Sequence, residues 1–279
     1  DKMSSVLDIT YKKPEKFESV VSASLMSADA YIGFGNKKFS WTNSFRYNNN
    51  RFLLNSLETS GEYRPNFTDY QTYFSYRPNS KWSFDIIGNY NSNHYNFYPK
   101  TRETTFGTMD NVKSFNVYFD GQENDIFKTT SATFGITRQF SPISSISLIA
   151  SSFTSNEKEQ YDIQSQYWLT QTESQENLGV GTFFEHARNY LKANVNILKL
   201  ILKHNIDKHN IEAGITLKDE HIKEYSNEYE MRDSSGYSIP HTGTDLNMIY
   251  SLNANNRINS RRIESYIQDT WKFSSPNEN

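Results

Sequence analysis

The sequence predicts an all-β fold: an antiparallel transmembrane β-barrel, of which this chain supplies roughly nine strands. Three features of the sequence support this prediction. Its apolar content is carried mainly by aromatic residues. Polar and apolar residues alternate along many stretches. Short turns also alternate with long polar segments.

The composition does not fit an ordinary globular core. Of the 279 residues, 15% are aromatic and only 35% are hydrophobic, and the mean hydropathy is -0.77. Soluble cores bury mostly aliphatic residues, whereas aromatic and small polar residues suit strands that end in aromatic girdles at a membrane boundary. No stretch approaches the roughly 18 apolar residues that a transmembrane helix requires. The net charge of -3 gives no reason to expect nucleic acid as a partner.

Period-two alternation is the clearest local signal, and it predicts strands with two different faces. In the first example, Phe39, Trp41 and Phe45 alternate with small polar residues. Similar alternation is found in residues 70–76, 82–91, 128–140, 146–150, 191–197, 211–218 and 262–273.

The connections between these strands differ in length. Short turns are expected at 77–81, 141–145 and 206–210, and long loops at about 48–66, 92–126, 156–188 and 224–257. Short turns at one end and long loops at the other are typical of outer-membrane barrels. A soluble sandwich has no reason to keep this rhythm.

The chain is expected to be a piece of a larger protein. Asp1–Ser5 lacks the basic and apolar regions of a secretory signal, so the signal has been removed or the chain is incomplete. The final strand is followed only by residues 274–279, which resemble a turn. Barrels of this class close with an even number of strands, so we expect further strands to complete it.

Four segments resemble the TonB-dependent outer-membrane receptors, especially a Bacteroidota-type branch. Asp1–Pro14 resembles the last strand of the plug domain and its exit into the barrel, and Tyr266–Phe273 is similar to a barrel strand that often reads Tyr-x-Gln-Asp-x-Trp. The other two segments resemble extracellular loops and lie at residues 51–71 and 102–123.

This resemblance implies that residues 1–14 end a plug and residues 15–279 form the N-terminal part of a barrel of about 22 strands. It also implies energy-coupled uptake of a scarce solute, such as an iron chelate, an oligosaccharide, a peptide or cobalamin. The implied partners are outer-membrane lipid, the remaining plug and barrel, the inner-membrane TonB-type complex and a surface lipoprotein. No cofactor is implied, and the implied location is the outer membrane of a Gram-negative bacterium.

Polar residues within the strands are expected to face the barrel lumen, because the inner face of such a barrel is polar. These residues are Arg46, Asp69, Asp85, Arg138, Lys192, Glu264 and Lys272. Their ordinary role is to bind neighbouring groups, the plug or water, so polarity alone identifies no ligand.

Aromatic residues in two of the expected loops are the candidate ligand-binding groups, since exposed aromatics often recognise sugars and peptides. They are Tyr161, Tyr167, Trp168, Tyr225, Tyr229 and Tyr237. The alternative interpretation is structural: these residues belong to an aromatic girdle or pack loops against each other. The six histidines show no compact zinc-ligand spacing, so we expect no metal site.

Two alternative functions remain open at this stage. The chain could form a small stand-alone outer-membrane barrel that acts as a passive pore or an adhesin, or a soluble β-sandwich that binds a ligand. An enzyme is not expected, because the sequence contains no nucleophile elbow and no phosphate-binding glycine loop.

Overall fold

The computed structural model describes residues 9–55, 61–108, 111–171, 176–233 and 246–271. Almost all of them belong to strands, and the only helix among them is the single turn α1. The elements are β1 (Glu18–Ala23), β2 (Ser27–Gly35), β3 (Phe39–Asn49), α1 (Arg51–Asn55), β4 (Gly61–Tyr63), β5 (Asn66–Asn79), β6 (Trp82–Pro99), β7 (Arg102–Thr108), β8 (Asn111–Ser141), β9 (Ser144–Gln171), β10 (Glu176–Ile206), β11 (His209–Asp233) and β12 (Asn247–Trp271).

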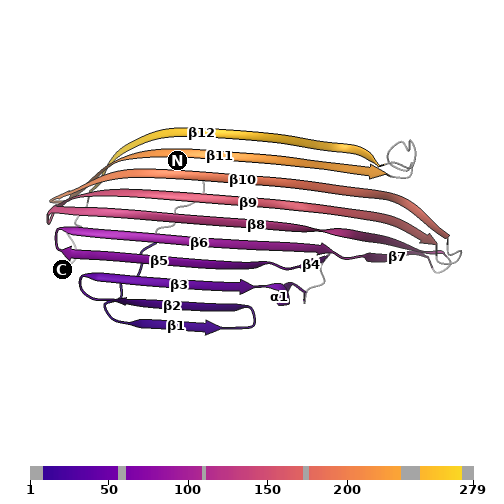
Figure 1. Cartoon of the computed structure of the whole chain (residues 1–279), viewed down its shortest axis with the longest axis horizontal. Coiled ribbons are helices and arrows are strands. Elements are labelled where there is room, and N and C mark those ends of the chain that lie inside the picture. Colours follow the sequence, from indigo (N-terminus) through magenta and orange to yellow (C-terminus); the bar gives the residue numbers. More distant parts are fainter. Residues whose placement is uncertain (1–8, 56–60, 109–110, 172–175, 234–245, 272–279) are drawn as a thin grey trace, which may run out of the picture.

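The strands form one open, antiparallel sheet that follows the order of the chain. The path is β1-β2-β3-β5-β6-β8-β9-β10-β11-β12, with β4 paired to β6 and β7 paired to β8. Figure 1 shows this sheet as a single layer, with β1 and β12 at its two edges. The predicted antiparallel all-β class is confirmed, although the path contains ten strands in place of the nine expected.

The three predicted short turns are confirmed, and they lie at one end of the sheet. β5 meets β6 between Asn79 and Trp82, and the carboxamide oxygen of Asn79 accepts hydrogen bonds from the backbone amides of Lys81 (2.9 Å) and Trp82 (3.1 Å). Two-residue turns also join β8 to β9 and β10 to β11. In the last of these, Asp207 adopts a positive φ of 50°, which an aspartate tolerates better than most residues.

The predicted long loops are largely wrong, because most of their residues continue the strands. Residues 111–126 belong to β8, 156–171 to β9, 176–188 to β10 and 224–233 to β11. At about 3.3 Å per residue, a 31-residue strand such as β8 is about 100 Å long, whereas about ten residues cross a membrane. We call the part of the sheet formed by residues 111–131, 152–171, 176–196, 219–233 and 247–261 the extension.

The two faces of the sheet differ in the half that carries the short turns. Residues paired directly opposite each other share a face, so the strand register defines both faces. One transverse row contains Ile86, Phe134, Ala150, Leu198, Leu217 and Ile263. We call this side the apolar face and the other side the polar face, and we keep both names along the full length of the strands.

The sheet has almost no closed hydrophobic core. Tyr73 and Ala187 are the only buried hydrophobic residues among those described, whereas large apolar side chains such as Leu198 and Ile263 are 43% and 78% exposed. A soluble protein rarely exposes a continuous apolar surface of this kind. The apolar face therefore needs an apolar environment outside the sheet.

No helix in the described parts of the chain is long and apolar enough to cross a membrane. The N-terminal stretch is irregular from residue 9 to residue 17, so the strand expected at the end of a plug is not found within residues 9–14. Residues 1–8, which carry the rest of that expectation, lie outside the described residues.

Candidate functional site

The N-terminal stretch lies on the polar face, where Tyr11 stacks on Tyr73 with 4.9 Å between ring centroids. The Tyr73 hydroxyl donates a 2.6 Å hydrogen bond to Asp85 on the neighbouring strand. The ammonium of Lys13 lies 3.6 Å from the same carboxylate and 5.5 Å from the Tyr73 ring. These contacts leave Tyr73 only 5% exposed, so the stretch is anchored to the sheet.

Glycines on β2 allow this close approach. A Cβ atom on Gly33 would lie 3.0 Å from the Pro14 ring, and one on Gly35 would lie 2.4 Å from the Pro14 carbonyl oxygen. Pro14 is itself buried. A larger side chain on either glycine would push the N-terminal stretch away from the sheet.

Four of the predicted lumen-facing residues do share the polar face. Arg46 pairs directly with Asp69, and its guanidinium donates a 2.9 Å hydrogen bond to Asp29 on β2. Asp85 lies on the same face beside Tyr73, and Glu264 lies there opposite Thr216. Lys272 lies outside the described residues.

The prediction for Arg138 is wrong, because this residue lies on the apolar face. It is paired with Trp82, and its guanidinium carbon lies 5.2 Å from the Trp82 ring and 5.0 Å from the Phe140 ring. Arg138 lies four and two positions from Phe134 and Ile136 along β8, so all three side chains point to the same side of the sheet. It extends its charge among aromatic rings beside the short turn.

The prediction for Lys192 is also wrong, and the physical reason is an ambiguous strand. β10 is apolar on both faces near its short turn, because Ile197 and Leu198 point to opposite sides. The apolar face of this strand is formed by Leu198, Leu200 and Leu202. Lys192 lies an even number of positions from all three along the strand, so its side chain points to the same side. Lys192 therefore lies on the apolar side of the sheet, opposite Lys223.

The candidate ligand-binding aromatics lie in strands and not in loops, and they do not form one surface. Tyr161 and Tyr167 are on the polar face of β9, whereas Trp168 is on its apolar face. Tyr225 and Tyr229 lie on the apolar side of β11. Tyr237 lies outside the described residues. The strand period separates residues that a mobile loop could have brought together.

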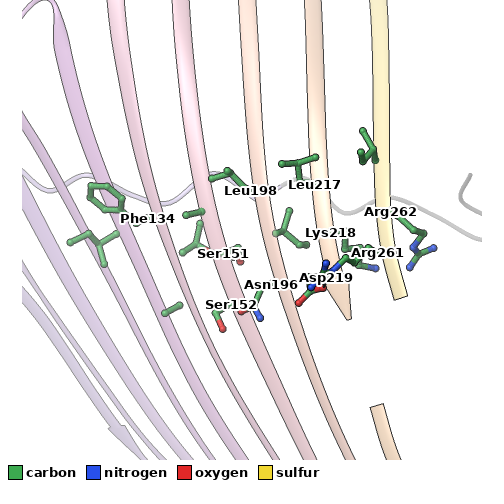
Figure 2. A pocket seen from close by; sticks show the side chains of 16 residues that line it. Phe134, Ser151, Ser152, Asn196, Leu198, Leu217, Lys218, Asp219, Arg261 and Arg262 are labelled. Atoms are coloured by element: carbon green, nitrogen blue, oxygen red, sulfur yellow. Dashed lines mark hydrogen bonds and ion pairs between the residues drawn. The ribbon is translucent and has the colours of Figure 1, made fainter. Parts of the chain in front are cut away.

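The apolar face ends abruptly where the extension begins. The row that contains Leu198 and Leu217 is followed by a row with Ser152, Asn196 and Asp219. Figure 2 shows these two levels beside each other, in a hollow of about 720 Å³ that crosses the boundary. The change from apolar to polar side chains between these two adjacent rows marks one edge of the apolar band.

Beyond this boundary the apolar side of the sheet becomes basic. One transverse row carries Lys128, Asn156, Lys192, Lys223 and Arg257. We call these five residues the basic row. They lie about 13 Å along the strands from the boundary row, and a hollow of about 390 Å³ is found among them.

The polar face of the extension is acidic. Eight of the carboxylates that share it are Glu123, Asp125, Glu157, Glu159, Glu185, Glu224, Glu228 and Glu230. We call them the acidic surface. Because lysines and glutamates alternate along β9 and β11, the strand period sends the two charges to opposite sides of one sheet.

Burial changes the ionisation of this surface. Burial, followed by the negative charge of Asp125, raises the pKa of the Glu123 carboxyl to about 7. Burial likewise raises the pKa of Asp125 and of Glu185. The pKa values of Tyr95 and Tyr161 rise to about 12, first through burial and then through neighbouring carboxylates.

The acidic surface was not identified as a site in the sequence, although a signal was present. Glu123 and Asp125 are spaced by two residues, as are Glu157 and Glu159, and such a spacing places charges on one face of a strand. These residues were expected in loops, where a spacing of two residues does not place side chains on one face. The spacing therefore did not predict an acidic surface.

Comparisons with known proteins define no family for this chain. No family model matches it, and no curated protein matches it. One solved structure with some similarity is the CymD monoaromatic hydrocarbon channel, with 6% identity, 92% of this chain and 86% of that chain covered, and a TM-score of 0.25.

Proposed function

We propose that this chain forms part of the wall of an outer-membrane β-barrel that lets a solute cross the membrane. One observation carries the proposal: the sheet turns an apolar band to one side and holds polar residues and the N-terminal stretch on the other. Lipid would contact the apolar face, and the polar face would line the interior. Antiparallel neighbours in chain order are the connectivity of such a wall.

The negative charge on the polar face of the extension would give the barrel interior a preference for cations. Carboxylates that line one surface raise the local concentration of cations and repel anions. A hollow of about 380 Å³ on this surface is bordered by Glu157, Glu159, Asn189, Glu224 and Glu228. The solute class that the wall favours is therefore cationic, or an anionic group accompanied by a bound cation.

A finer proposal is an energy-coupled receptor of the TonB-dependent type. The anchored stretch at Tyr11, Lys13 and Pro14 supports it, because a chain that leaves an internal plug would follow the polar face to reach β1. In that case a solute bound at the extension would be released inward by work done on the plug. A passive pore is the second candidate, and the open polar surface of the extension supports it.

Transport by the full protein that contains this chain would separate these proposals. Purified protein would be inserted into planar bilayers to measure conductance and cation preference. Uptake would also be measured in cells with and without a functional inner-membrane energy-coupling complex. Energy-dependent uptake without steady conductance supports the receptor, and steady cation-selective conductance supports the pore. A protein that fails to enter bilayers and stays soluble without detergent contradicts both.

A further inference from the structure

Three carboxylates of the acidic surface converge between β8 and β9. Asp125 is paired directly with Glu159 across the two strands, and Glu123 is two residues from Asp125 on the same face. One oxygen of each carboxylate lies within 4.8 Å of those of the other two. Like charges directly opposite each other destabilise a sheet, so this arrangement needs a compensating group.

Asp125 is the most buried of the three carboxylates. The residue is only 6% exposed, and its Oδ1 atom is buried without a hydrogen-bond partner. An unpartnered buried carboxylate oxygen is costly and rare in native proteins. The groups that act on the ionisation of Glu123 and Asp125 include no lysine and no arginine. No cationic side chain of the described residues therefore compensates them.

The outer carboxylate of the cluster, Glu159, is held by a neighbouring side chain on β10. Asn189 donates hydrogen bonds to Glu159 (3.0 Å) and to Glu228 (2.6 Å), so it holds the outer carboxylate in place. Its own Oδ1 atom is also buried without a partner. The hollow of about 380 Å³ borders Glu159 and Asn189, so it reaches the outer carboxylate of the cluster.

We propose that Glu123, Asp125 and Glu159 bind a divalent cation, and that the cation is calcium. The ligands are all hard oxygen atoms, without the histidine or cysteine that softer metals prefer. Calcium accepts irregular sets of six to eight oxygen atoms, including water, whereas magnesium demands near-ideal octahedral geometry. The bound ion would link β8 to β9 about 30 Å beyond the apolar band, measured along β8 from Ala132 to Glu123.

Neighbouring groups confirm that negative charge is crowded around Glu123. Burial, followed by the charge of Asp125, raises the pKa of Glu123 to about 7, and Glu159 and Glu185 contribute further negative charge. The groups that face Glu123 from neighbouring strands are Tyr95 on β6, Tyr161 and Glu159 on β9 and Glu185 on β10.

Terbium luminescence tests the site directly on the full protein in detergent. Tyr95 is paired with Asp125 and Tyr161 with Glu123, so both rings lie close enough to sensitise a bound Tb³⁺ ion. We expect saturable terbium emission that calcium displaces. Asp125→Asn and Glu159→Gln should each weaken calcium binding by about tenfold or more, because each removes a charged ligand.

Glu157→Gln is the matched control. It removes the same charge from the same face of β9, but Glu157 accepts a hydrogen bond from Ser155 at 3.0 Å and lies outside the cluster. Its affinity should stay within about threefold of the wild-type value. Equal losses in the control and in the cluster variants would overturn the proposal, because they would indicate only general attraction to an acidic surface.

A second measurement covers the case in which a cluster variant does not fold. Amide hydrogen exchange of the wild-type protein, with calcium and with a chelator, should show slower exchange around residues 123–127 and 157–161 when calcium is present. The same exchange rates in both conditions, together with absent terbium emission, would overturn the proposal. The barrel function does not depend on this outcome, since bilayer conductance is measured separately.

Discussion

At the scale of single residues, the contact between Tyr11 and Tyr73 holds the N-terminal stretch on the polar face. The stacked rings are supported by the Tyr73 hydrogen bond to Asp85 and by the Lys13 ammonium. An aromatic pair contributes about 0.5–1.5 kcal/mol beyond the area that it buries. Loss of one ring should therefore free the stretch without unfolding the sheet.

Tyr11→Ala should lower the free energy of unfolding by about 1–2 kcal/mol and make the N-terminal stretch sensitive to protease. Tyr11→Phe keeps the ring and should behave as the wild type. Urea unfolding and limited proteolysis in detergent would measure both effects. Wild-type protease resistance in Tyr11→Ala would contradict the proposed anchor.

Glu123 should make the stability of the extension depend on pH when no divalent cation is present. Its pKa is raised to about 7 in the folded state, so between about pH 4.5 and 7 the folded state holds more protons than the unfolded state. Stability should therefore fall as the pH rises through this window. The melting temperature in a chelator, compared between wild type and Glu123→Gln, checks this. Identical pH slopes in the two proteins would refute it.

Some residue positions could be predicted from the sequence and others could not. Arg46, Asp69 and Asp85 follow clear alternation, so their shared face was predictable. The face of Lys192 was not predictable, because β10 is apolar on both sides near its turn. Only the pairing of β10 with β9 and β11 shows on which side of the sheet Lys192 lies. A single strand without its neighbours does not define which of two apolar faces meets lipid.

At the scale of elements, the extension is the main feature beyond a simple membrane wall. Its residues have polar side chains on both faces, so the hydropathy alternation that reveals a strand disappears there. The backbone ladders continue regardless, since each amide and carbonyl finds a partner on the adjacent strand. This is why the short turns were predictable from their turn-forming residues and the long strands were not.

Hydrogen exchange should distinguish strands from loops in the extension. Backbone amides in residues 156–169 and 182–188 should exchange slowly in intact protein, because they lie in central ladders. Mass spectrometry on the detergent-solubilised protein would measure this, with residues 207–208 of the turn between β10 and β11 as the fast-exchanging reference. Exchange as fast as that of the reference would restore the loop interpretation.

The basic row should contact phosphate-bearing lipids around the barrel. Lys192 and Lys223 lie opposite each other beyond the apolar band, where long ammonium side chains can reach anionic headgroups. Lys192→Gln with Lys223→Gln should reduce co-purification of anionic lipid, measured by native mass spectrometry. Lys208→Gln, at the turn at the other end of the same strand pair, is the control. Equal lipid retention in all three proteins would argue against this role.

At the scale of the whole molecule, one sheet separates three environments. An apolar band lies near the short turns, a basic row lies beyond it on the same side, and the acidic surface with the anchored N-terminal stretch occupies the opposite side. A soluble sandwich would bury one of these faces against a second sheet. The described strands instead form a single layer, so the account depends on lipid covering the apolar face.

Site-specific labelling can test that dependence directly, because the chain contains no cysteine. Single cysteines at Leu198 and Ile215 on the apolar face, and at Ile197 and Thr216 on the polar face, would carry a spin label in the full protein reconstituted in bilayers. The account predicts that labels at 198 and 215 collide with lipid-dissolved oxygen, whereas labels at 197 and 216 collide with a water-soluble nickel chelate. Equal access to the nickel chelate at all four positions would contradict it.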